Sequence, residues 1–210
     1  MTGPETEAAD SAAAAQALLA LIPDWVLAYG DSPALSGFVP PEVRRSWLGY
    51  VVYFPGELLP GQPRFVWGGT PTPQWLLALL ERHRSKGTYI YQLECAAAAS
   101  PYFSLPAEWF EGRTVWHYID NQPACYGFIK GGAKCADASR LILLTLLRAA
   151  RLACRPWFDY VDTESNYADV PTRPNLRDIA ALLALGPQWP LRLPSEEELD
   201  CAWSHLSHLI

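Results

Sequence analysis

The sequence predicts an α/β domain whose mixed sheet carries helices on its faces. Three β-rich runs come first, in close succession and with connections rich in proline and glycine, at residues 24–33, 46–57 and 63–73. Such a succession is typical of an antiparallel meander. From residue 114 onward the pattern changes to strand, helix, strand and helix, and this alternation indicates parallel strands with helices packed on the sheet.

The later elements follow from apolar periodicity and from turn residues. Residues 73–85 and 88–100 are expected to be helices, the second stopped by Pro101. A strand is expected at Thr114–Ile119, then helices through residue 151 and a strand at 156–161. A last helix opens near Asn166, whose side chain suits an N-cap.

Length and composition are those of a globular protein. The chain has 210 residues, of which 50% are hydrophobic and 18% are charged, and one domain of this size can bury a full core. We expect an acidic, then helical extension at residues 1–22, the domain at 23–186 and a C-terminal tail with a short helix at 187–210.

Hydropathy and cysteine spacing exclude several classes. The apolar stretch at residues 12–22 is interrupted by Gln16 and is shorter than the roughly 20 residues of a membrane span, so we expect a soluble, unsecreted, intracellular protein without a membrane partner. The 5 cysteines form no C-x-x-C pair, which favours reduced, buried thiols over a zinc site or a disulfide framework. The net charge of −6 argues against a nonspecific polyanion binder, although a carboxylate cluster that binds cations would also make a chain acidic.

Acidic residues stand where the predicted strands end and helices begin. Asp31 ends the first strand and Asp120 follows the fourth, so the two lie side by side if these strands are parallel neighbours. Glu94 lies beside the apolar face of its helix, and Asp169 lies in the first turn of the last helix. Any one of these acids alone is better explained as a helix cap or a solvated turn.

Taken together, the acids predict a metal site. Carboxylates gathered without basic partners repel one another unless cations neutralise them. Oxygen ligands favour Mg²⁺ or Mn²⁺ over zinc. Two such ions about 4 Å apart can activate a water and stabilise the leaving oxygen in phosphodiester cleavage.

These motifs resemble those of the ribonuclease H domain, especially the domain that retroelement polymerases carry. The resemblance spans residues 23–173 and rests on "YIDNQPA", "SNYADVPTR", "YQLECAAA" and "AYGDSPA", which contain Asp120, Asp169, Glu94 and Asp31. It implies a mixed five-stranded sheet of order 3-2-1-4-5 and two bound Mg²⁺ ions. It also implies hydrolysis of the RNA strand of an RNA–DNA hybrid, which leaves a 3′-hydroxyl and a 5′-phosphate.

The resemblance also implies roles for single residues. Asp31, Glu94 and Asp120 would share the metals, and Asp169 would complete the site. Asn121 and Gln122 fall where the family places side chains that reach the minor groove, where an amide can recognise the RNA 2′-hydroxyl; for Gln122 an exposed helix start is the alternative.

Basic residues follow at the break between two predicted helices. Lys130, Lys134 and Arg140 flank Gly131 and Gly132, where the family contacts the hybrid. Phosphate contacts need such charges. Arg140, Arg148 and Arg151 share one helical stripe, for which a solvated face is the simpler interpretation. Three tryptophans, Trp109, Trp116 and Trp157, are expected to pack in the core or at its rim, with base stacking as the less favoured alternative.

Two departures from the family pattern and two alternatives accompany this interpretation. No histidine stands in residues 161–172, and a long insertion after Asp31 replaces the usual tight turn.

The partners implied are an RNA–DNA hybrid and a reverse transcriptase domain of a longer polyprotein. The alternatives are a non-enzymatic scaffold or nucleic-acid-binding module with the same fold, and a nuclease or integrase of the same superfamily that acts on DNA.

Overall fold

The structure is a computed structural model, and it describes residues 25–31, 46–82, 90–172, 184, 186–199 and 201, with only the backbone at 25–31, 81 and 82. The strands are β1 (Trp25–Asp31), β2 (Trp47–Tyr53), β3 (Phe65–Pro71), β4 (Thr114–Ile119) and β5 (Arg155–Tyr160). The helices are α2 (Gln74–Arg82), α3 (Ile90–Ser104), α4 (Gln122–Lys130), α5 (Ala136–Arg151) and α6 (Asp169–Thr172), with short 3₁₀ turns at Ala107–Trp109 and Thr163–Ser165. The helix expected at residues 12–22 lies outside the described residues.

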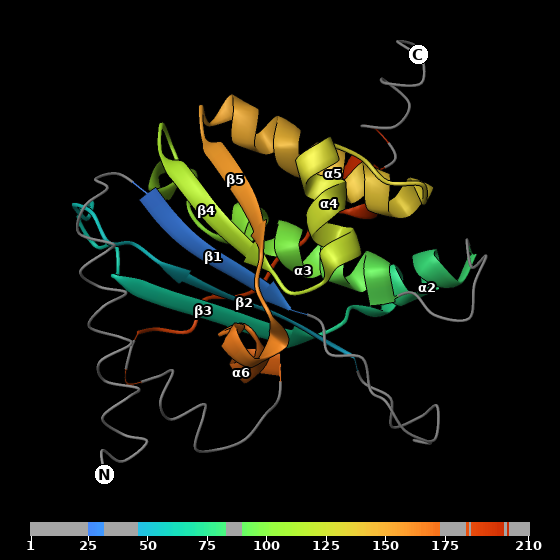
Figure 1. The fold of residues 1–210 in the computed structure, drawn as a ribbon, viewed down its shortest axis with the longest axis horizontal. Coiled ribbons are helices and arrows are strands. Elements are labelled where there is room, and N and C mark those ends of the chain that lie inside the picture. Colours follow the sequence, from blue (N-terminus) through green and yellow to red (C-terminus); the bar gives the residue numbers. More distant parts are fainter. Residues whose placement is uncertain are drawn as a thin grey trace.

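The strands form one mixed sheet of order β3-β2-β1-β4-β5 (Figure 1). β2 pairs antiparallel with both β1 and β3, which confirms the predicted meander. β4 pairs parallel with β1 on one side and with β5 on the other. The observed order is the one that the ribonuclease H resemblance implies.

Helices cover both faces of this sheet. α3 packs against β1, β2 and α5, while α4 packs against β4 and β5. On β2 the alternate residues Leu48, Tyr50 and Val52 join the buried clusters on this side. α6 packs against β2 and β3 on the opposite side, where Val51 and Trp67 form a small cluster with Val170. Because side chains alternate along a strand, β2 therefore supports α3 with one face and α6 with the other.

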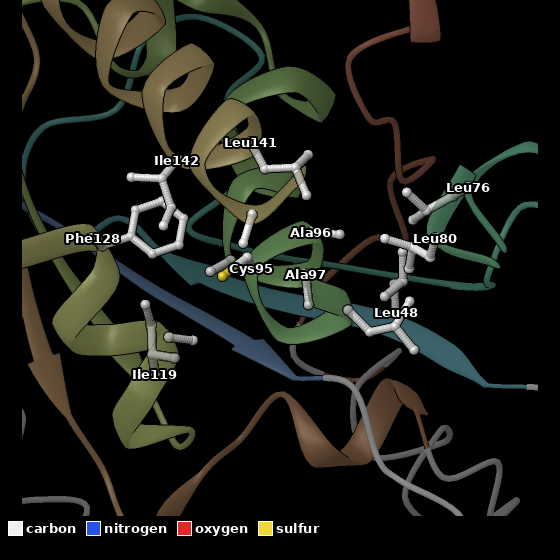
Figure 2. Packing of buried hydrophobic residues seen from close by; sticks show 14 of the residues in the cluster. Leu48, Leu76, Leu80, Cys95, Ala96, Ala97, Ile119, Phe128, Leu141 and Ile142 are labelled. Atoms are coloured by element: carbon white, nitrogen blue, oxygen red, sulfur yellow. The ribbon is translucent and has the colours of Figure 1, made fainter. Parts of the chain in front are cut away.

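The largest buried cluster surrounds α3. Residues 96–99 are four successive alanines, and each is 0% exposed. Figure 2 shows Ala96 and Ala97 between Leu48 and Leu80 on one side and the Phe128 side of the cluster on the other. Small side chains on all sides of this helix let the sheet and the neighbouring helices approach it closely.

The prediction that Pro101 stops this helix is wrong, because α3 continues to Ser104 with Pro101 inside it. A proline inside a helix leaves the carbonyl four residues earlier without its N–H donor. Here that carbonyl belongs to Ala97, and the Ser100 hydroxyl donates to it at 2.7 Å. The serine thus replaces the hydrogen bond that the proline removes.

The segment at residues 187–199, expected in a C-terminal tail, packs along β3. The Trp189 amide donates to the Trp67 carbonyl at 2.7 Å, and the Trp189 indole donates to the Ser104 carbonyl at 3.1 Å. The Trp189 and Trp109 rings lie 5.1 Å apart. The short helix predicted for the tail is present at residues 196–199, and its Leu199 is buried in the main cluster.

The cysteine prediction holds in part. All five cysteines are free, and Cys95, Cys125 and Cys154 are buried, but Cys135 is half-buried and Cys201 is exposed. Within the described part of the chain, no helix has the length and apolar character needed to cross a membrane.

The tryptophan prediction also holds only in part. Trp109 is buried and Trp116 is half-buried, as expected of packing residues. Trp157 is 63% exposed, so its predicted packing role is wrong. It lies on the edge strand β5 with the parity opposite to that of buried Phe158, and for this reason it points away from the covering helices.

His117 of β4 is fully buried among aromatic rings. Its ring lies 5.4 Å from that of Phe158 and 6.4 Å from that of Phe128, and its Nδ1 lies 3.2 Å from the Tyr102 hydroxyl. Its Nε2 is buried and forms no hydrogen bond. Burial lowers the pKa of His117 from 6.5 to about 3.

We therefore expect His117 to make the protein acid-labile. Above about pH 6.5 the imidazole is neutral in both the folded and the unfolded chain, so it does not change the free energy of unfolding with pH. As the pH falls towards 3, the unfolded chain binds a proton that the folded chain does not, and the free energy of unfolding drops by up to about 1.4 kcal/mol per pH unit. Urea unfolding from neutral pH down to about pH 4.5 should show a shallower decline for His117→Phe than for the parent. Parallel declines would contradict this prediction.

Candidate active site

The carboxyl ends of β1 and β4 meet at one edge of the sheet. Gly30 is the register partner of Ile119 in this parallel pair. Asp31 and Asp120 are the next residues of the two strands, so their backbones lie side by side at the strand ends. The prediction that these two acids occupy adjacent strand ends is confirmed for the backbone. The Asp31 side chain lies outside the described residues.

Asp120 is the best-defined acid of this edge. Its side chain is half-buried, and its Oδ1 is buried without a hydrogen-bond partner. Burial raises the pKa of Asp120, the nearby Asn166 side chain opposes the rise, and the negative charge of Asp169 adds to it. Nearby positive charge would favour the ionised form of this carboxylate.

The loop after β5 brings Asp169 to the same place. Asp162 accepts a hydrogen bond from the Ser165 amide at 3.1 Å, and the Asn166 Oδ1 accepts one from the Ala168 amide, also at 3.1 Å. Asn166 is 4% exposed, so this turn is fixed from inside the protein. α6 starts at Asp169, whose negative charge contributes to raising the pKa of Asp120.

Glu94 is buried, with 5% of its surface exposed, on the α3 helix that packs against β1 and β2. As predicted, Glu94 is not in bulk water, but α3 is buried on all sides and has no single apolar face. Among the described side chains, no three His, Cys, Asp or Glu residues lie close enough to hold a metal ion. Asp169 acts electrostatically on Asp120, and the assignment of Asp31, Glu94, Asp120 and Asp169 to one metal site stays a prediction.

Asn121 and Gln122 lie directly after Asp120, at the start of α4. The Asn121 Oδ1 accepts a hydrogen bond from the Ala124 amide at 3.0 Å, so this side chain is the N-cap of the helix. Gln122 is exposed at the first turn. An exposed amide beside the acidic edge fits either of the roles that the sequence left open for Gln122.

The basic residues lie at the far end of α4 and on α5. Lys130 and Lys134 are exposed around Gly131, whose φ of 73° ends the helix. Arg140 is half-buried and Arg151 is exposed. Arg148 does not belong to a solvated stripe, because its Nε donates to the Tyr102 carbonyl and its guanidinium lies 5.2 Å from the Phe103 ring centre.

Two glycines at this edge were not singled out from the sequence. Gly49 of β2 and Gly69 of β3 are register partners, and both face the segment that carries Asp169. The signal was present, since a glycine inside a strand pattern often marks the close approach of another backbone.

Comparison with known proteins adds one similar fold. No family model matches the chain, and no curated protein matches it. A solved structure of the N-terminal RNase H domain of rv2228c from Mycobacterium tuberculosis, fused to maltose-binding protein, is similar with a TM-score of 0.44 and 12% identity. The match covers 77% of this chain and 97% of that chain.

Proposed function

We propose that this chain is a ribonuclease H that hydrolyses the RNA strand of RNA–DNA hybrids endonucleolytically with two metal ions. The observation that carries the proposal is the β1–β4 register, which places the backbones of Asp31 and Asp120 at adjacent strand ends. The negative charge of Asp169, which contributes to raising the pKa of Asp120, agrees with it. The sequence motifs around the four acids support the same function. They also support a retroelement origin, with a reverse transcriptase domain as partner.

The residues at this edge suit a hard divalent cation. Asp120 Oδ1 is buried and accepts no hydrogen bond, and a second carboxylate lies close enough to raise the pKa of Asp120. Oxygen ligands of this kind select Mg²⁺, with Mn²⁺ as a substitute. Asp31, Glu94, Asp120 and Asp169 would hold two ions. Bound there, the ions supply activation of a water and stabilisation of the leaving oxygen.

The other predicted site residues, which are not acidic, would hold the substrate. Gln122 is exposed next to the acids, where its amide can donate to or accept from a ribose 2′-hydroxyl. Lys130 and Lys134 are exposed one helix length away and can contact phosphates, and the half-buried Arg140 would add to them. Asn121 contributes first by fixing the start of α4 through its cap.

Cleavage should depend on both the substrate and the metal. With Mg²⁺ or Mn²⁺, the protein should cut a hybrid labelled on its RNA strand and leave matched duplex RNA and duplex DNA intact. A chelator should stop the reaction, and Ca²⁺ should permit binding with little cleavage. A gel of the labelled strands measures all of these outcomes. Undiminished cleavage in excess chelator would refute the metal mechanism, and binding without cleavage under every metal would favour the non-enzymatic module.

A further inference from the structure

The α6 segment lies directly on two glycines of the sheet. A Cβ built on Gly49 would lie 2.5 Å from Thr172 Cγ2, 3.2 Å from the Ala168 carbonyl oxygen and 3.2 Å from Pro171 Cγ. A Cβ on Gly69 would lie 2.7 Å from the Pro171 carbonyl oxygen. Real Cβ atoms essentially never lie within 3.0 Å of another heavy atom. A side chain at position 49 must therefore move Thr172, and one at position 69 must displace the Pro171 backbone or the strand.

The segment packs against the sheet and is braced by an internal hydrogen bond. Val170 packs against the cluster of Val51 and Trp67 on β2 and β3. The Thr172 hydroxyl donates to the Asp169 carbonyl at 2.9 Å, which ties the residue above Gly49 to the residue that bears the carboxylate. A shift of Thr172 is therefore passed on to Asp169.

Gly49 also adjoins the other acids of the edge. It is the register partner of Asp31 in the β1–β2 pair, and β1 in turn pairs with the strand that Asp120 follows. The glycine thus lies between the strand end that carries Asp31 and the helix start that carries Asp169.

We propose that Gly49 and Gly69 are positioning residues, whose missing side chains let α6 lie at the depth that sets Asp169 against Asp120. The seating of α6 stands on the geometry alone, while its consequence for metal binding rests on the proposed function. Residues around metal ligands commonly change affinity by about 10–100-fold when they are altered, and the same size of effect is expected here.

The seating is tested without metal. In Gly49→Ala, hydrogen exchange of the Asp169 and Val170 amides, which donate to the Asn166 and Tyr167 carbonyls, should accelerate several-fold. Gly68→Ala is the matched control, since its Cβ would meet Tyr50 and the Trp189 carbonyl instead, on the other face of the sheet. Unchanged exchange in Gly49→Ala, or equal acceleration in Gly68→Ala, would overturn the proposal.

The consequence is tested with Mn²⁺, whose binding can be followed by its paramagnetic resonance signal. Affinity should fall about tenfold or more in Gly49→Ala and stay at the parent value in Gly68→Ala. Adding Thr172→Ser removes the crowding methyl and keeps the hydroxyl, so the double variant should regain at least half of the loss on a logarithmic scale. Parent-like affinity in Gly49→Ala, or no recovery, would overturn the positioning role.

Two further outcomes of these experiments also have a definite meaning. If the parent itself binds no Mn²⁺, the proposed function fails, and the exchange experiment alone decides the seating of α6. If Gly49→Ala does not fold, the double variant takes its place: recovery of folding supports the proposal, and no recovery overturns it.

Discussion

Replacing Asp120 with asparagine should reduce cleavage of an RNA–DNA hybrid by at least about a thousandfold in Mg²⁺, because the substitution removes a charged ligand where the metals would bind. The asparagine keeps the size of the side chain and the strand end that precedes it. Single-turnover cleavage of a labelled hybrid measures the effect, and hybrid binding in Ca²⁺ provides the comparison with the parent.

The same variant should melt at or above the parent temperature in metal-free buffer. Burial and the charge of Asp169 both raise the pKa of Asp120, so the ionised carboxylate is less favourable in the folded chain than in the unfolded one. This penalty is present at neutral pH and disappears as the pH falls below the folded pKa, where the carboxyl is protonated. Asparagine removes it at every pH. A large drop in melting temperature would show instead that Asp120 is structural.

Glu94→Gln should bind hybrid, melt near the parent temperature and cleave at least about a hundredfold more slowly at low Mg²⁺. Glutamine keeps the shape and much of the hydrogen-bonding capacity of this buried side chain, but it cannot supply a charged ligand to a cation. Because the exposed Lys130 and Lys134 are unchanged, binding of the hybrid should survive.

The matched control is Glu108→Gln, the same change at an exposed position in the turn after α3. It should cleave like the parent, since surface substitutions usually change stability by no more than about 0.5 kcal/mol. A magnesium titration in which Glu94→Gln cleaves at the parent rate would exclude Glu94 from the site. It would also weaken the ribonuclease H interpretation as a whole.

The strand framework was predictable because its signals are local. Each strand is a short apolar run that ends at a turn residue, and α4 begins where "DNQP" supplies an N-cap and a first-turn proline. The position of Asp120 follows from these signals alone. The proximity of Asp31 needed one further assumption, that the first and fourth strands are parallel neighbours, and the register bears it out.

The wrong predictions concern two kinds of side chain. One kind replaces a lost backbone hydrogen bond nearby, and the other packs against residues far away in the sequence. Pro101 reads as a helix stop, because nothing in a propensity argument shows that Ser100 will turn its hydroxyl to the Ala97 carbonyl. Arg148 reads as a solvated charge, yet it contacts Tyr102 and Phe103 of another helix. The docking of Trp189 depends on residues about a hundred positions earlier, which periodicity does not detect.

The alanine run of α3 has a consequence for how this chain tolerates mutation. A stretch of four alanines carries no polar or bulky side chain that would mark it as important in the sequence. Each of these side chains is 0% exposed, so a substitution by any larger residue must displace the sheet or a neighbouring helix, and overpacking of this kind destabilises a core by about 1–3 kcal/mol. Glu94 lies on the same helix two residues before the run, and it moves with the helix. In a saturation mutagenesis of the whole chain, this plain segment should rank among the least permissive.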